Sequence, residues 1–198
     1  MARLANSRKE DTHERIVAAA ARAIRRHGYA GVGVADVMKE AGLTHGGFYA
    51  HFKSRDDLLV EALARAGSDS RANISRAAQA RKARGVSAFR ALVDSYLSEA
   101  HLASMDTGCP VAALGGDMAR QTGAVRTASA QRVDRLIAMV RDTLPGASRA
   151  GAAVIAATLV GSLQLARALG DVAEGRALLA AARKALLQQH DAASTDTH

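Results

Sequence analysis

Residues 34–58, VADVMKEAGLTHGGFYAHFKSRDDL, decide the fold of this chain. The apolar residues Val37 and Met38 lie three and four positions after Val34, and this spacing predicts a helix with one apolar face. Gly42 is expected to end that helix. A second helix is predicted from Thr44, whose hydroxyl is placed to cap its first backbone N–H groups. Two short helices joined by a tight turn form a helix-turn-helix unit.

The second helix of this unit is expected to have a buried face and an exposed face. Phe48 and Phe52 are four residues apart and are predicted to face inward. The residues that this arrangement turns outward are His45, Gly46, Tyr49 and Lys53. They offer an imidazole, a phenol and an ammonium group, and no carboxylate follows until Asp56. A surface of this kind is suited to phosphates and base edges.

The run FYAHFKSRDDL at residues 48–58, preceded by AGLT at residues 41–44, resembles the DNA-binding domain of TetR/AcrR-type transcriptional repressors. About twenty positions agree in residue type and spacing, far more than in a short motif, and the resemblance covers roughly residues 10–60. It implies an all-α protein with an N-terminal three-helix helix-turn-helix domain and a C-terminal helical ligand-binding and dimerisation domain. It also implies that DNA is contacted by Thr44, His45, Gly46, Gly47, Tyr49, His51 and Lys53.

The composition supports a helical protein that meets a polyanion. Of the 198 residues, 48% are hydrophobic but only 3% aromatic, and two prolines interrupt the chain. The net charge is +8, yet residues 1–60 contain ten Lys and Arg against seven Asp and Glu, so charge alone does not identify the DNA-binding part. One cysteine excludes an internal disulfide framework. The basic N-terminus is not followed by the apolar segment that a signal peptide would require, so a cytoplasmic protein is expected.

Three segments are predicted along the chain: a helix-turn-helix domain at residues 1–60, a helical regulatory and dimerisation domain at residues 61–190, and a disordered tail at residues 191–198. Residues 1–9 are expected to be a mobile arm, either a loose terminus or a contact to DNA, followed by a helix from about Asp11. Ser54 and Asp57 mark the start of a long helix that reaches about Ala83.

The second domain is predicted to contain four or five helices. Residues 86–102 and 125–144 each show one apolar face, whereas residues 147–169 are apolar nearly all round. The uncharged run 150–166 is interpreted as a buried helix and not as a membrane span. A helix that is apolar all round must be covered on more than one side. We therefore predict a homodimer through the last two long helices, with Leu178, Leu179, Ala182, Leu186 and Leu187 in a four-helix bundle.

The single cysteine, Cys109, lies in TGCPV at residues 107–111. Because proline suits the first turn of a helix, Cys109 is expected at the N-cap of a helix that starts at Pro110. Thiols at helix N-termini are often reactive, and residues 108–114 are similar to the cysteine-bearing segment of electrophile-responsive repressors of the family. No lysine occurs between Ala83 and Arg183 to assist the thiol. A small buried hydrophobic residue is the plainer interpretation.

A small-molecule pocket in the second domain is the usual means of control in the family. Its candidate lining residues are Phe89, Val93, Tyr96, Met105, Met118, Met139, Leu163 and Gln164. Tyr96 and Gln164 would supply polar groups in an apolar wall. Each of these residues could equally be part of the core.

An enzyme is not expected. The seven histidines do not fall into a metal-ligand spacing, and neither a Gly-rich phosphate loop nor a nucleophile elbow is present, so no cofactor or metal is predicted. The sequence thus predicts a DNA-binding regulator, a repressor that releases a palindromic operator when a small molecule binds or Cys109 is modified. The alternative is a helical ligand-binding or redox-sensing dimer without operator binding.

Overall fold

A computed structural model describes residues 2–144, 146–170 and 172–191, and within these ranges it contains helices and no strand. The predicted all-α class is confirmed. The elements in chain order are α1 (Ala2–His27), α2 (Val34–Glu40), the 3₁₀-helix η1 (His45–Ala50), α3 (Arg55–Lys82), α4 (Ala88–Tyr96), α5 (Glu99–Ala103), α6 (Pro110–Met118), α7 (Gly123–Arg141), α8 (Arg149–Ala168) and α9 (Val172–His190).

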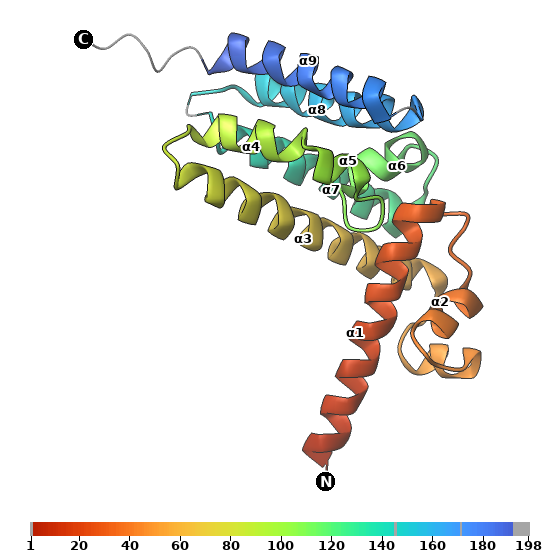
Figure 1. Cartoon of the computed structure of the whole chain (residues 1–198). Coiled ribbons are helices and arrows are strands. Elements are labelled where there is room, and N and C mark those ends of the chain that lie inside the picture. The colour runs from red at the N-terminus through yellow and green to blue at the C-terminus, as the bar shows by residue number, and fades with distance from the viewer. Residues whose placement is uncertain (1, 145, 171, 192–198) are drawn as a thin grey trace.

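The helices form a small N-terminal module and a larger layered module (Figure 1). The small module comprises α1, α2, η1 and the start of α3, and the N-terminal part of α1 extends away from the rest of the molecule. In the larger module, α3 forms one outer layer and α8 with α9 the opposite one, with α4 to α7 between them. Helix α3 packs on α1, α4 and α7, so it connects the two modules.

Helix α3 has the start and length predicted from the sequence. The Ser54 hydroxyl accepts a hydrogen bond from the Asp57 N–H at 3.1 Å, and Asp56 and Asp57 lie in the first turn, where carboxylates favour the helix dipole. The helix continues for 28 residues. At 1.5 Å per residue it spans about 40 Å, which is long enough to join both modules.

Two predicted helix boundaries are wrong. Helix α1 begins at Ala2, not near Asp11, so the predicted arm at residues 1–9 is helical from residue 2. The predicted helix 86–102 is divided into α4 and α5. The break occurs because Ser98 leaves the helix and caps α5: its hydroxyl accepts from the His101 N–H at 3.2 Å and donates to the Ser95 carbonyl at 2.9 Å.

Helix α8 is the one helix within the described ranges that is long and apolar enough to cross a membrane. It packs between α7 and α9, and its residues Ala152, Ile155, Ala156, Leu159, Leu163 and Ala166 are buried. This packing supports the interpretation of α8 as a core helix.

Residue 191, the first residue of the predicted tail, is fixed in the structure. The Asp191 carboxylate accepts hydrogen bonds from the Ser87 hydroxyl and from Arg90 Nε, the latter at 2.8 Å. The remainder of the predicted tail, residues 192–198, lies outside the described residues.

Polar contacts join the small module to the larger one at the C-terminal end of α1. The Tyr29 hydroxyl lies 2.7 Å from the Ser129 hydroxyl of α7, in a buried position. Arg26 donates two hydrogen bonds of 2.6 Å to Asp106, in the loop before α6. A displacement of α6 or α7 would therefore act directly on α1.

Candidate DNA-binding surface and effector cavity

The two phenylalanines of the helix-turn-helix unit are buried, whereas Tyr49, which lies between them in the chain, faces solvent. Phe48 and Phe52 are 2% and 3% exposed, and their rings stack at 5.4 Å. Tyr49 is 74% exposed, and Lys53 is also exposed. The predicted inner and outer faces are confirmed. The aromatic pair anchors a short element that could not persist alone in water.

The second element of the unit differs from the expected α-helix. Residues His45–Ala50 form the 3₁₀-helix η1, and Thr44 occupies the N-cap position without a side-chain cap hydrogen bond. The predicted capping by the Thr44 hydroxyl is therefore wrong, and that hydroxyl stays available to solvent. Two glycines, Gly46 and Gly47, lower the α-helical propensity here, and so short an element gains little from cooperativity.

The seven predicted DNA contacts are placed on one small region but are not equally accessible. Thr44, His45, Gly46, Tyr49 and Lys53 are exposed, whereas Gly47 and His51 are half-buried. His51 Nδ1 is buried and has no hydrogen-bond partner within the described residues. Burial lowers the pKa of His51, and the charges of His13 and Lys9 lower it further. His51 thus lies against α1, with its ring 5.9 Å from that of His13.

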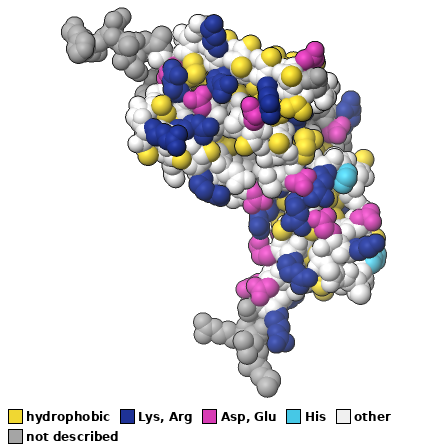
Figure 2. Space-filling view, viewed as in Figure 1, with side chains coloured by type: hydrophobic (Ala, Val, Ile, Leu, Met, Phe, Trp, Pro, Cys, Tyr) yellow, Lys and Arg dark blue, Asp and Glu magenta, His cyan; other side chains and the backbone are white. Residues whose placement is uncertain are grey.

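Arginines fix the orientation of the turn by hydrogen bonds to backbone carbonyls. Arg15 of α1 donates to the Ala41 carbonyl at the end of α2. Arg55 donates to the Val32 carbonyl at 3.0 Å and to the Tyr29 carbonyl. These basic residues therefore support the scaffold of the turn. In Figure 2, Lys and Arg side chains alternate with Asp and Glu over the face in view.

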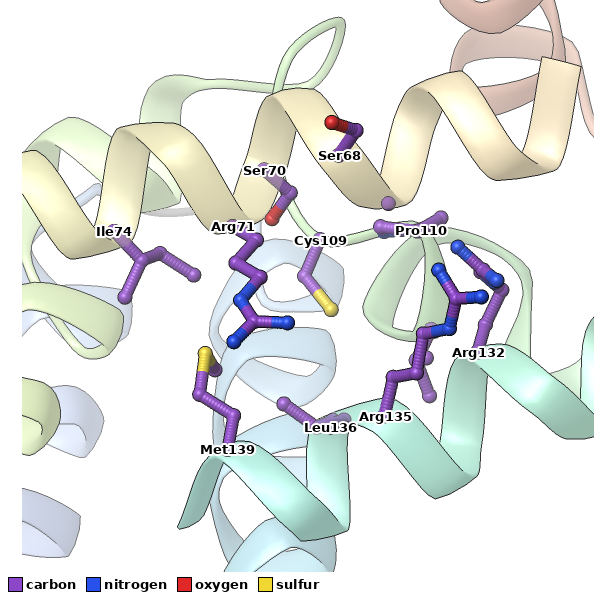
Figure 3. A pocket seen from close by; sticks show the side chains of 12 residues that line it. Ser68, Ser70, Arg71, Ile74, Cys109, Pro110, Arg132, Arg135, Leu136 and Met139 are labelled. Carbon is purple, nitrogen blue, oxygen red and sulfur yellow. The ribbon is translucent and has the colours of Figure 1, made fainter. Parts of the chain in front are cut away.

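A cavity of about 170 Å³ lies between α3, α6 and α7 (Figure 3). Its lining residues are Gly67, Ser68, Ser70, Arg71, Ile74, Cys109, Pro110, Val111, Arg132, Arg135, Leu136 and Met139. Three of them are arginines and none is a carboxylate. The cavity combines apolar walls with a few polar groups, which is typical of small-ligand sites.

Cys109 is the N-cap residue of α6 and is followed by Pro110 in the first turn, as predicted. It is 4% exposed, and its side chain lines the cavity. Its N–H donates to His101 Nε2 at 3.0 Å, and His101 Nδ1 lies 2.7 Å from the Tyr96 carbonyl, which only accepts. Both contacts are satisfied by the neutral Nδ1–H tautomer. Burial lowers the pKa of His101 to about 4.

A cation that the sequence does not reveal lies near Cys109. Arg167 of α8 donates to the carbonyls of His101 and Ser104, at 2.8 and 3.2 Å. Burial lowers the pKa of Arg167, while Tyr96 and Cys109 act in the opposite direction. Arg167 lies 58 positions beyond Cys109 in the chain, so no local pattern connects the two residues.

The predicted pocket residues are not assembled in one place. Cys109 and Met139 line the cavity, whereas Met105 lines a separate groove beside α5 and α8. Phe89, Val93, Tyr96, Met118 and Leu163 belong to the hydrophobic core, and Gln164 is half-buried. The sequence does not predict the cavity arginines. Across the described ranges, no cluster of His, Cys, Asp and Glu is arranged to hold a metal ion.

The architecture defines a class: a helix-turn-helix DNA-binding module on a helical domain with a small-ligand cavity. Residues 16–62 match the family model described as bacterial regulatory proteins of the tetR family, and residues 85–186 match the tetracyclin repressor-like C-terminal domain. The chain belongs to the TetR family of transcriptional regulators. As a member of this family it is a DNA-binding regulator and not an enzyme.

Known proteins agree with this assignment. An uncharacterized HTH-type transcriptional regulator of Mycobacterium tuberculosis is 33% identical over 171 residues, which cover 80% of this chain and 86% of the relative. A TetR transcriptional regulator from Chloroflexus aurantiacus has a similar fold, with a TM-score of 0.70, 22% identity and coverage of 93% and 98% of the two chains. The reduced form of Escherichia coli NemR gives a TM-score of 0.71 at 19% identity, with coverage of 90% and 97%.

Proposed function

We propose that this protein is a cytoplasmic homodimeric repressor that binds a palindromic operator and releases it when an effector occupies the second domain. The observation that carries the proposal is the orientation of η1: Phe48 and Phe52 are buried while Tyr49 and Lys53 are exposed. We expect the exposed side chains to offer a hydroxyl and an ammonium to phosphates, and His45 to meet a base edge.

Helix α1 adds a second contact to the proposed DNA interface. Its N-terminal part extends beyond α2 (Figure 1), and Arg8 and Lys9 on this part are exposed. A rigid helix presents these cations at lower entropic cost than the mobile arm expected from the sequence. We expect them to contact phosphates beside the groove that η1 enters.

The proposed dimer interface is a stripe of exposed apolar residues on α8, at its C-cap Leu169 and at the start of α9. Val154, Leu165 and Leu169 are 67%, 60% and 48% exposed, and Val172 is 59% exposed. Large apolar side chains gathered on one face indicate an interaction surface. Leu179 and Leu186, for which the sequence predicts contact with the partner, are 2% and 5% exposed and face the core of their own protomer. Leu178, Ala182 and Leu187 are half-buried.

The effector signal would pass through α6. The cavity lies at the N-terminal end of α6, and the loop before this helix is tied to α1 by the Arg26–Asp106 pair. A ligand that binds one position of α6 more tightly than another shifts the population of the two states. In a dimer, a small rotation of α1 changes the separation of the two η1 elements and so the fit to two half-sites.

The experiment is a fluorescence-anisotropy titration with the inverted repeat found in DNA that flanks the coding region. If the protein is a repressor, it should bind this duplex more tightly than a scrambled one. The logarithm of the affinity should fall linearly with the logarithm of the salt concentration. Equal affinity for both duplexes would instead support the helical sensor without operator binding.

Release through Cys109 is tested separately with N-ethylmaleimide, which adds to a thiol without an oxidant. The sulfur forms a bond to one alkene carbon and a proton is delivered to the other. We expect treated wild type to lose operator affinity and Cys109→Ser to keep it. The Cys109→Ser variant contains no thiol, because Cys109 is the only cysteine. Equal loss of operator affinity in both proteins would therefore come from reaction at another group and would remove Cys109 from the mechanism.

A further inference from the structure

The cavity between α3, α6 and α7 gathers positive charge that no protein group neutralises. Arg71 comes from α3, and Arg132 and Arg135 come from α7. Within the part of the chain that the structure describes, none of these three arginines forms an ion pair. The charge of Arg135 acts unfavourably on Arg132, and an anion between the guanidinium groups would relieve this repulsion.

Arg132 shows most clearly that a partner is missing. Its side chain is 6% exposed, and its Nε is buried with no hydrogen-bond partner among the described residues. Burial lowers the pKa of Arg132, and the charge of Arg135 lowers it further. Buried polar groups are otherwise almost always satisfied, so an unpaired guanidinium beside a cavity points to a ligand.

Two further groups at the cavity favour an anion. The first turn of α6 has no side-chain cap, so the backbone N–H groups that follow Pro110, beginning with that of Val111 on the cavity wall, retain their positive potential. Ser70 is 5% exposed and also lines the cavity. Its hydroxyl can donate to a ligand oxygen.

The remaining walls are apolar, so the ligand needs an apolar part as well as an anionic group. Ile74, Leu136 and Met139 line the cavity on the side away from Arg132 (Figure 3). A fully hydrated inorganic ion would leave this surface without a partner. A carboxylate on a short carbon skeleton matches both parts, because guanidinium groups bind carboxylates in a bidentate manner and the skeleton can cover the apolar residues.

We propose that this cavity binds a small organic carboxylate, held by Arg132, Arg135 and Arg71 next to the Cys109 thiol. The inference deepens the proposed function, since it rests on the effector role of the second domain and names the chemical class of the effector. Occupation would draw α7 and α3 toward the start of α6, which is the element coupled to α1.

Binding is tested by calorimetry on the full chain without DNA, so that a failure of operator binding does not affect the result. The probes are benzoate and hexanoate, with the neutral benzamide and hexanamide as matched controls. We expect the carboxylates to bind and the amides not to. Arg135→Gln should weaken binding at least about tenfold, the value of one charge-assisted hydrogen bond. Arg141→Gln, on the exposed surface of the same helix, should not change it.

Cys109 provides an independent reporter because it is the only cysteine. Iodoacetate carries a carboxylate and iodoacetamide does not, and each alkylates a thiolate with loss of iodide. We expect the iodoacetate-to-iodoacetamide rate ratio at Cys109 to exceed that of glutathione, and to fall in Arg135→Gln and Arg132→Lys. Added benzoate should slow the reaction with either reagent.

Three results would overturn the proposal. They are equal affinity for a carboxylate and its amide, an unchanged affinity in Arg135→Gln, and no binding of either carboxylate below about 10 mM. Arg135 is exposed, so its substitution should leave the fold intact even where Arg132 variants do not. Operator release by benzoate, measured afterwards, would link the cavity to DNA binding.

Discussion

Lys53 is an exposed cation on the proposed DNA surface with no carboxylate partner within the described residues. We expect Lys53→Ala to weaken binding to every duplex by a similar factor, because a phosphate contact carries no sequence information. The slope of log affinity against log salt should become shallower by about 0.9 for each phosphate that the variant no longer neutralises. Lys82→Ala, in the last turn of α3, is the matched control and should leave both quantities unchanged.

His101 makes a pH-dependent contribution to stability that can be assigned to one residue. Burial holds its pKa at about 4 in the folded protein, against 6.5 for an unperturbed histidine. The unfolded chain therefore binds more protons between these values. The contribution is present above pH 6.5 and is lost as the pH falls toward 4, by about 3 kcal/mol. Urea unfolding should show a steeper loss for wild type than for His101→Gln over this range, and parallel curves would contradict the assignment.

Gly67 illustrates a site residue that no sequence pattern identifies. A Cβ at this position would lie 2.8 Å from Arg132 Nη1, so the guanidinium rests on the space that this glycine leaves. Gly67→Ala should stabilise α3 by up to about 1 kcal/mol, because alanine is the better helix former. It should nevertheless weaken carboxylate binding by displacing Arg132. Thermal unfolding should therefore show a higher stability for Gly67→Ala, while calorimetry should show a lower carboxylate affinity. If the glycine had only a structural role, the substitution would change stability alone.

At the scale of elements, the sequence predicts those features that depend on residues close together in the chain. The start of α3 follows from Ser54 and Asp57, and the N-cap at Cys109 follows from Pro110. The 3₁₀ geometry of η1 does not follow from the sequence, because tertiary packing overrides local propensity in so short an element. The early start of α1 is also not predicted, because the sequence offers a helix-start signal near Asp11 that the structure does not use. Arg71 and Arg132 are 61 positions apart, so only the packing of α3 on α7 reveals their shared cavity.

The cap of α3 links an element to DNA binding. Ser54→Ala removes the acceptor for the Asp57 N–H and should cost about 1 kcal/mol of stability. It should also lower operator affinity, because the frayed turn adjoins Phe52 and Lys53. Ser148→Ala removes the equivalent cap of α8, where Ser148 accepts from the Gly151 N–H at 3.0 Å, and should destabilise similarly without the effect on DNA. Equal operator affinity of the two variants would show that the cap of α3 does not contribute to DNA binding.

At the scale of the whole molecule, operator recognition depends on a dimer, because regulators of this family bind operator DNA as dimers. Leu165 lies near the middle of the apolar stripe and is 60% exposed in the protomer. Leu165→Glu would place two like charges in a dry interface, so we expect a monomer in sedimentation equilibrium at micromolar concentration. The monomer should keep its helical circular dichroism but lose operator affinity by far more than the contribution of one half-site.

Ala80→Glu is the control for this substitution, since Ala80 is exposed on α3, in the outer layer opposite α8 and α9 (Figure 1). It introduces the same charge and should leave both the dimer and operator binding intact. Carboxylate binding separates the two levels of function: the cavity is formed within one protomer, so Leu165→Glu should retain benzoate affinity while it loses the operator. Loss of both activities would show that the cavity is completed only when the second copy is in place.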